Sequence, residues 1–129
     1  MITEKQVFRE IIEICPFYKR TWEKHLEHYG EELLYVSVPD MLNRCLDLYE
    51  NNEEKKIALV FEAVEKLLVE GNKDVKELIE IGVLEEFIHI FGSHYKEFIK
   101  FLQPKSLEVW KTKKQRLVDI PYPKVDYYL

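Results

Sequence analysis

The sequence NEEKKIALVFEAVEKLLVEG, residues 52–71, carries the most regular hydrophobic pattern in the chain. Its apolar residues recur every three or four positions, as they do on the face of an α-helix that packs against a core. The expected buried face is Ile57, Val60, Phe61, Val64, Leu67 and Leu68. Asn52 belongs to the residue types that cap helix N-termini, and Gly71 to those that follow helix ends. The stretch therefore predicts one amphipathic helix between Asn52 and Gly71.

Helical spacing of apolar residues continues on both sides of this stretch. On the N-terminal side it predicts helices over residues 3–15, 17–29 and 39–49. On the C-terminal side it predicts helices over residues 72–79, 83–91, 93–102 and 106–117. Gly30 is expected to cap one helix in a left-handed conformation, and Pro39 to open the next. Gly82 is expected to break the chain direction, and Ser93 and Ser106 to cap the helices that follow them.

Two segments do not follow the helical pattern. Residues 31–38 alternate as a strand would, but no second strand-like run exists to pair with them, so a connector is predicted. Residues 119–129 contain two prolines and three tyrosines and predict an extended C-terminal tail. The whole chain, residues 1–129, is expected to be one all-α domain. We predict a compact bundle of six to eight helices, with armadillo-like stacking in its second half.

The charges are divided unevenly along the chain. Residues 1–95 carry 20 acidic and 11 basic side chains, a net charge of −9, whereas residues 96–129 carry 4 and 8, a net charge of +4. An acidic body repels nucleic acid and attracts a basic partner. No run of about 20 apolar residues is present to span a membrane, and no targeting segment opens the chain. A cytoplasmic protein with no nucleic-acid or membrane partner is expected.

The sequence contains no motif of a known catalytic site. Phosphate-binding glycine loops and nucleophile elbows are absent, and the 4 glycines leave little material for such loops. Cys15 and Cys45 lie within apolar patterns and form no paired-cysteine motif, so both are read as buried thiols. Adjacent glutamates occur as pairs, which could in principle serve in acid–base catalysis. Runs of charged residues on a helix are usually solvated, so no catalytic pair is expected. We expect no enzyme activity, no catalytic residue and no cofactor.

Histidine spacing leaves one alternative open. His25 and His28 are three residues apart, so both can face the same side of a helix, with glutamates nearby. A metal-dependent hydrolase or a metal-sensing domain would use these two histidines. No further motif supplies a third ligand, so no metal site is expected.

Several segments resemble a known family. They are WEKHLEHYGEELLYVSVPDMLNRCLDL at 22–48, FEAVEKLL at 61–68, GNKDVKELIEIGVLEEFI at 71–88 and LQPKSLEVW at 102–110. Together they resemble small all-helical bacterial domains of unknown function, some of which resemble immunity proteins of polymorphic toxin loci. The resemblance implies a helical, non-enzymatic protein that binds a protein partner, and it supplies no catalytic residues.

The expected function is therefore that of a non-enzymatic protein-binding domain, and its most concrete form is an immunity protein that neutralises a basic toxin domain. Tyrosine and tryptophan are the residue types that dominate recognition hot spots, and the chain has 8 Tyr and 2 Trp. The predicted partner-binding residues are Glu27, Glu31, Glu32, Glu53 and Glu54, which would steer a cationic partner, and Tyr29, Tyr35 and Tyr49, which would anchor it. A homodimeric scaffold is a further alternative, in which the basic helix with Lys111, Lys113, Lys114 and Arg116 binds the acidic body of a second copy.

Overall fold

The computed structural model describes the backbone of residues 1–119 and the side chains of residues 1–113, and over that range the fold is all-α as predicted. The α-helices are α1 (Val7–Ile14), α2 (Lys19–Tyr29), α3 (Leu34–Asn43), α4 (Cys45–Glu50), α5 (Glu54–Glu70), α6 (Lys73–Ile79), α7 (Phe87–Phe91), α8 (Tyr95–Phe98) and α9 (Pro104–Asp119). Shorter 3-10 turns lie at Glu4–Gln6, Pro16–Tyr18, Gly92–His94 and Ile99–Phe101, and a π-helical turn lies at Glu80–Leu84.

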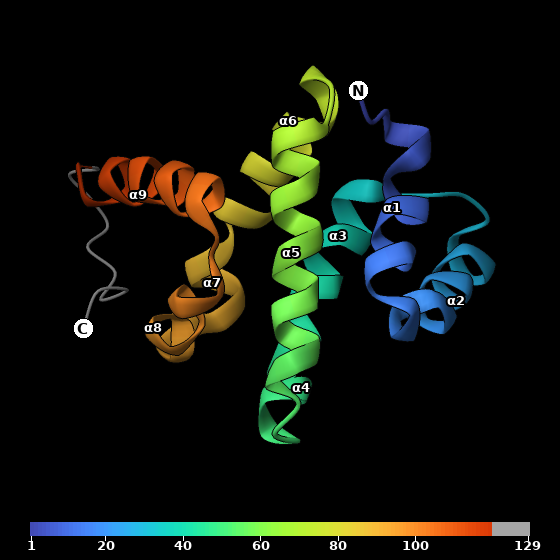
Figure 1. Ribbon diagram of the computed structural model, residues 1–129, viewed down its shortest axis with the longest axis horizontal. Coiled ribbons are helices and arrows are strands. Elements are labelled where there is room, and N and C mark those ends of the chain that lie inside the picture. Colours follow the sequence, from blue (N-terminus) through green and yellow to red (C-terminus); the bar gives the residue numbers. More distant parts are fainter. Residues whose placement is uncertain (120–129) are drawn as a thin grey trace.

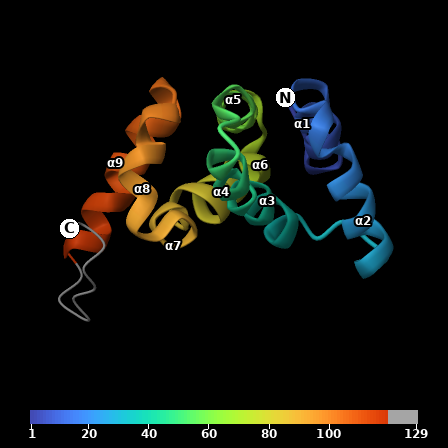
Figure 2. The ribbon, with the colours of Figure 1, turned by 90° about the horizontal axis from the view of Figure 1, so that it is seen from below.

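Helix α5 is the centre of the molecule. It contacts α1, α4, α6 and α9, and Figure 1 shows α1 and α2 on one side of it and α7, α8 and α9 on the other. Every residue of its predicted apolar face is buried, as the sequence predicted. The view from below shows the same order, with α3, α4 and α6 beside α5 between the two outer groups (Figure 2). Within the described residues, no helix is both long and apolar enough to cross a bilayer.

The prediction of a connector at residues 31–38 is wrong from Leu34 onward. Helix α3 begins at Leu34, and Pro39 lies inside it rather than opening it. Proline removes one helical hydrogen bond, but burial of one face of the segment compensates. Val38 is fully buried, and the Pro39 ring packs beside Gly82 of the π-helical turn. The buried hydroxyl of Tyr18 also donates a hydrogen bond to the carbonyl of Ser37 at 3.1 Å.

Glycine and asparagine mark the helix ends only in part as expected. Gly30 closes α2 with a φ of +73°, and the Asn72 side chain accepts the backbone N–H of Val75 at 2.9 Å at the start of α6, so both predictions are confirmed. Asn52 is not the cap of α5: it has a φ of +59°, and Glu53 takes the N-cap position. Gly71 ends α5 in an extended conformation, where a Cβ would collide with the Leu67 carbonyl and the Val75 side chain.

Three further predicted helix boundaries are wrong. Gly82 does not interrupt the helical backbone. It lies in a π-helical turn in which the Glu85 N–H donates to the Glu80 carbonyl at 2.9 Å. Ser93 lies within a 3-10 turn and not at a cap. Helix α9 begins at Pro104, two residues before Ser106. The predicted tail at 119–129, with Tyr122, Tyr127 and Tyr128, lies outside the described residues except for Asp119, which belongs to α9.

Candidate functional site

Tyr35 lines an open hollow that also contains two glutamates. The hollow has a volume of about 330 Å³ and is lined by Glu4, Glu32, Leu33, Leu34, Tyr35, Val36 and Leu78, none of them basic. The Tyr35 side chain is 53% exposed and its neighbour Val36 is 45% exposed. An exposed aromatic ring beside an exposed aliphatic side chain is available for contact with another molecule.

The electrostatic environment of Tyr35 is negative. Partial burial raises the pKa of its phenol, and the carboxylates of Glu77, Glu4 and Asp74 raise that pKa further, in this order of effect. Three separate segments supply these charges, because Glu4 precedes α1, Glu32 precedes α3, and Asp74 and Glu77 lie on α6. We call Glu4, Glu32, Tyr35, Val36, Asp74 and Glu77 the Tyr35 patch.

The residues predicted to bind a partner do not form one surface. Glu32 and Tyr35 belong to the Tyr35 patch. Glu27 and Glu31 are exposed at the end of α2 and just after it. Figure 1 shows that the connection from α2 to α3 lies far from the connection from α4 to α5, where Glu53 and Glu54 are.

The predicted residues near the start of α5 already have contacts within the chain. Glu53 pairs with Lys56 at 2.9 Å, and Glu54 pairs with Lys100 at 3.3 Å. The half-buried Tyr49 packs its ring against the core residue Phe98, with the ring centroids 5.2 Å apart. These side chains are therefore less free to meet a partner than Glu32 and Tyr35 are.

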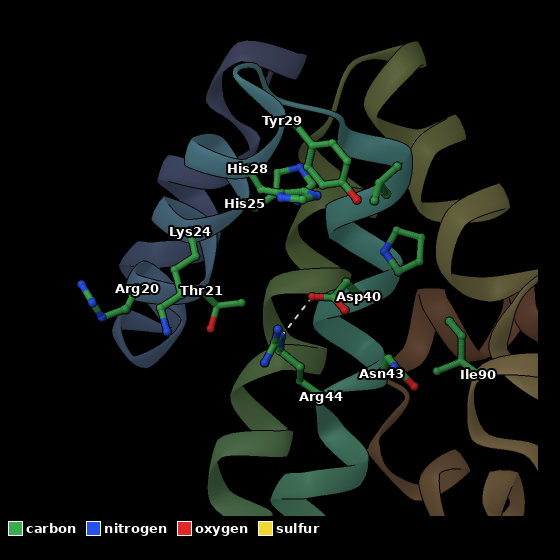
Figure 3. A pocket seen from close by; sticks show the side chains of 12 residues that line it. Arg20, Thr21, Lys24, His25, His28, Tyr29, Asp40, Asn43, Arg44 and Ile90 are labelled. Carbon is green, nitrogen blue, oxygen red and sulfur yellow. Dashed lines mark hydrogen bonds and ion pairs between the residues drawn. The ribbon is translucent and has the colours of Figure 1, made fainter.

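Tyr29 lies in a different environment, which is basic. It lines an open groove of about 610 Å³ between α2 and α3, which we call the α2–α3 groove. The groove is lined by Arg20, Thr21, Lys24, His25, His28, Tyr29, Val36, Pro39, Asp40, Asn43, Arg44 and Ile90. Figure 3 shows these side chains, with Arg44 paired to Asp40 across 3.0 Å. Val36 lines this groove and the hollow of the Tyr35 patch, so the two sites adjoin.

The two histidines of the metal alternative both lie in the α2–α3 groove. The Tyr29 ring contacts both of them, with centroid distances of 4.6 Å. Among the described residues, no group of three or more His, Cys, Asp or Glu side chains could hold a metal ion. The described part of the chain thus provides no third ligand for His25 and His28.

The two cysteines and the basic residues of α9 complete the residues singled out in the sequence. Cys15 and Cys45 are both fully buried, and burial raises the pKa of each thiol to about 12. A thiol with such a pKa is protonated at neutral pH and is a poor nucleophile. On the basic helix α9, Lys113 pairs with Glu85 of the same chain at 3.4 Å, while the side chains of Lys114 and Arg116 lie outside the described residues.

Sequence reasoning missed three acidic members of the Tyr35 patch and the basic residues of the groove. Asp74 and Glu77 are three residues apart on a predicted helix, which was a usable signal for one acidic face. Nothing in the local sequence connects them with Glu4 or Tyr35. Similarly, Lys24 lies on α2 whereas Arg44 follows the end of α3, and the acidic overall composition conceals a basic groove.

Comparison with known proteins identifies one family. A family described as "Domain of unknown function (DUF7674)" matches residues 8–117. No curated protein and no solved structure matches the chain. The expected armadillo-like stacking therefore stays a prediction.

Proposed function

The chain belongs to the DUF7674 family of domains of unknown function, and from its surface we propose that it is a non-enzymatic protein-binding domain whose partner is a basic protein. The more specific form of this proposal is an immunity protein that neutralises a basic toxin domain. The observation that carries it is the exposed Tyr35 ring in a hollow that Glu4 and Glu32 also line, with the carboxylates of Glu77 and Asp74 near enough to raise the pKa of Tyr35.

Each component of the Tyr35 patch supports a separate step of binding. Carboxylates on one surface attract a cationic protein and raise the rate of association. An aromatic ring that becomes buried in the complex lowers the rate of dissociation, because it removes a large apolar area from water at little entropic cost. The hollow beside Tyr35, lined by Leu33, Leu34 and Leu78, offers an apolar floor for a side chain of the partner.

In the proposed mechanism this protein performs no chemistry on its partner. It covers a basic surface that the partner needs for its own activity. A positively charged surface with which a nuclease binds nucleic acid is an example of such a surface. Glu32 and Tyr35 would then contact the partner directly. Glu27, Glu31, Glu53 and Glu54 would contribute to the long-range field, which salt screens within about 10 Å at 0.1 M ionic strength.

The test begins with capture of basic proteins from the native host on the immobilised chain, followed by purification of the captured protein and measurement of its association and dissociation rates. The double variant Glu32→Lys/Glu77→Lys should slow association at least tenfold, since steering is worth 10-fold or more at about 50 mM salt. Tyr35→Ala should mainly speed dissociation.

A matched variant separates the Tyr35 patch from the general acidity of the chain. Glu53→Lys/Glu54→Lys changes the net charge by the same amount at the start of α5, far from the connection between α2 and α3 (Figure 1). This control should leave the dissociation rate unchanged and should slow association less than Glu32→Lys/Glu77→Lys does. Equal rates for the wild type and both double variants would refute the proposal, and a larger effect of Glu53→Lys/Glu54→Lys would move the site to the start of α5. For the immunity form, the wild type should protect cells that express the captured protein, and Tyr35→Ala should not.

A further inference from the structure

The α2–α3 groove is a local basic site on an acidic protein. Its lining contains the cations Lys24 and Arg44 and one carboxylate, Asp40, so its net charge is +1 with neutral histidines; Arg20 also lines it but points away. The whole chain has a net charge of −5. A concentration of opposite charge in a hollow raises the local concentration of small anions there. Its volume of about 610 Å³ lies within the range of roughly 300–1,000 Å³ that is usual for small-molecule sites.

The lining of the groove contains side chains suited to a phosphate group. Figure 3 shows Thr21 of α2 and Arg44, the residue that follows α3, at the space between the helices, with Lys24 running along α2 beside them and Arg20 pointing away. Lysine and arginine donate charge-assisted hydrogen bonds to phosphate oxygens, and a hydroxyl such as that of Thr21 adds a neutral one.

Asp40 holds the arginine in position. Its carboxylate accepts the Arg44 Nε–H at 3.0 Å, from one helical turn earlier on α3. This bond uses one of the five N–H groups of the guanidinium and leaves its outer nitrogens for a ligand. Because the Asp40 pair orients Arg44 before a ligand arrives, less side-chain entropy is lost on binding.

A buried polar atom on the groove wall also lacks a protein partner. The Nε2 atom of His25 is inaccessible to solvent and has no hydrogen-bond partner among the described residues. Buried polar atoms are nearly always hydrogen-bonded, so the unpaired Nε2 would gain a partner if a ligand moved aside the ring that shields it. Tyr29, which is 45% exposed and packs on His25, is the side chain that such a ligand would displace.

From these features we propose that the α2–α3 groove binds a small phosphate monoester whose phosphate lies between Lys24 and Arg44 and whose polar body reaches His25. The shared chemistry of the ligand is a phosphate on a polar ring, as in a sugar phosphate or a nucleoside monophosphate. This site adjoins the Tyr35 patch at Val36, but its charged residues are different ones and it does not depend on the proposed protein partner.

The experiment is a titration of the purified chain, in about 50 mM salt, with ribose 5-phosphate and with adenosine 5′-monophosphate, followed by calorimetry and by backbone amide shifts. Ribose and adenosine serve as ligands without the phosphate, and inorganic phosphate serves as the phosphate alone. We expect at least one monoester to bind with a Kd below about 1 mM. We expect this monoester to change the amide shifts of residues on α2 and α3. The matching ligand without the phosphate, ribose or adenosine, should bind at least tenfold more weakly.

Charge-matched variants locate the site. Lys24→Gln and Arg44→Gln should each weaken binding about tenfold, the usual effect of losing one charge-assisted hydrogen bond. The controls Lys96→Gln and Arg9→Gln remove the same charges from exposed positions outside the groove and should have little effect. His25→Phe removes Nε2 but keeps a ring of similar size, and should weaken binding severalfold.

Three results would overturn the proposal. The first is no monoester binding at 10 mM ligand, a concentration about tenfold above the expected Kd. The second is equal binding with and without the phosphate, and the third is an equal loss of binding in the groove variants and the control variants. Unaltered binding in His25→Phe would overturn the contact with His25 and leave the phosphate site supported. Circular dichroism of each variant shows that any loss is measured on folded protein.

Discussion

The carboxylate of Glu65, in the middle of α5, accepts the backbone N–H of Ser106 at 2.8 Å in the first turn of α9. Its second oxygen accepts the N–H of Lys105 at 2.9 Å. The first N–H groups of a helix have no partner within the helix, and a negative charge there also complements the helix dipole. A residue 41 positions earlier in the chain therefore caps α9 and holds it against α5.

Glu65→Ala should destabilise the protein by about 1–2 kcal/mol, the usual cost of losing a helix cap. Glu65→Gln should cost less, because the amide oxygen can still accept one of the two hydrogen bonds. Urea unfolding followed by circular dichroism measures both values. The control is Glu62→Ala, an exposed residue on the same helix, and a loss of equal size there would contradict the capping role.

Gly71→Ala should destabilise the protein more than Gly30→Ala. A Cβ at Gly71 would collide with the Leu67 carbonyl and the Val75 side chain, whereas a Cβ at Gly30 meets nothing within 4 Å. Overpacking costs about 1–3 kcal/mol, and the left-handed conformation of Gly30 costs an alanine about 1–2 kcal/mol. Thermal unfolding of the two variants ranks them. The reverse order would show that the backbone conformation at Gly30 matters more than the space at Gly71.

Cys15 and Cys45 should not react with a thiol reagent in the native protein at pH 8 and should both react after unfolding in guanidinium chloride. Burial excludes the reagent, and burial also raises the pKa of both thiols from 9.0 to about 12, so thiolate is scarce. Absorbance of the released chromophore counts the reactive thiols. One rapidly reacting thiol per native chain would contradict the burial of that cysteine.

The same shifts make stability fall at alkaline pH. Between about pH 9 and 12 the unfolded chain loses the thiol protons that the folded chain keeps, so unfolding becomes easier as pH rises. The thiol contribution is fully present below about pH 9 and is lost through the range up to the folded pKa. Denaturant midpoints from pH 7 to 10.5 test this trend. The variant Cys15→Ala/Cys45→Ala should show a shallower decline, with the remainder due in part to Tyr18, whose pKa burial also raises.

Glu77→Gln should lower the pKa of the Tyr35 phenol, because the Glu77 carboxylate is the largest of the charges that raise it. Asp74→Asn should act in the same direction with a smaller effect. A pH titration of the protein with ¹³C-labelled tyrosine rings, with Tyr35→Phe used for assignment, gives the value directly. Glu97→Gln, on α8, is the control, and an equal shift there would mean that Tyr35 senses net charge rather than the patch.

The apolar residues of 57–68 recur with the 3.6-residue period of an α-helix. This repeat was enough to predict α5 and its buried face, because a helix places all of these side chains on one side, where they can be removed from water together. Local chemistry also predicted the caps at Gly30 and Asn72, where the capping group and the helix are adjacent in sequence. Helix α3 was missed since Pro39 is unfavourable inside a helix when only its neighbours are considered. Its packing beside Gly82, 43 residues later, offsets that cost.

The candidate sites follow the same division. Sequence alone selected Glu32 and Tyr35 by residue type, and it determined that the protein is helical and acidic. Tertiary structure decided that the carboxylates of Glu4, Asp74 and Glu77 lie close enough to raise the pKa of Tyr35, and that Lys24 and Arg44 line one groove. The physical reason is range: helix formation depends on contacts three or four residues apart, whereas an electrostatic site sums charges from segments that only the packed core brings together.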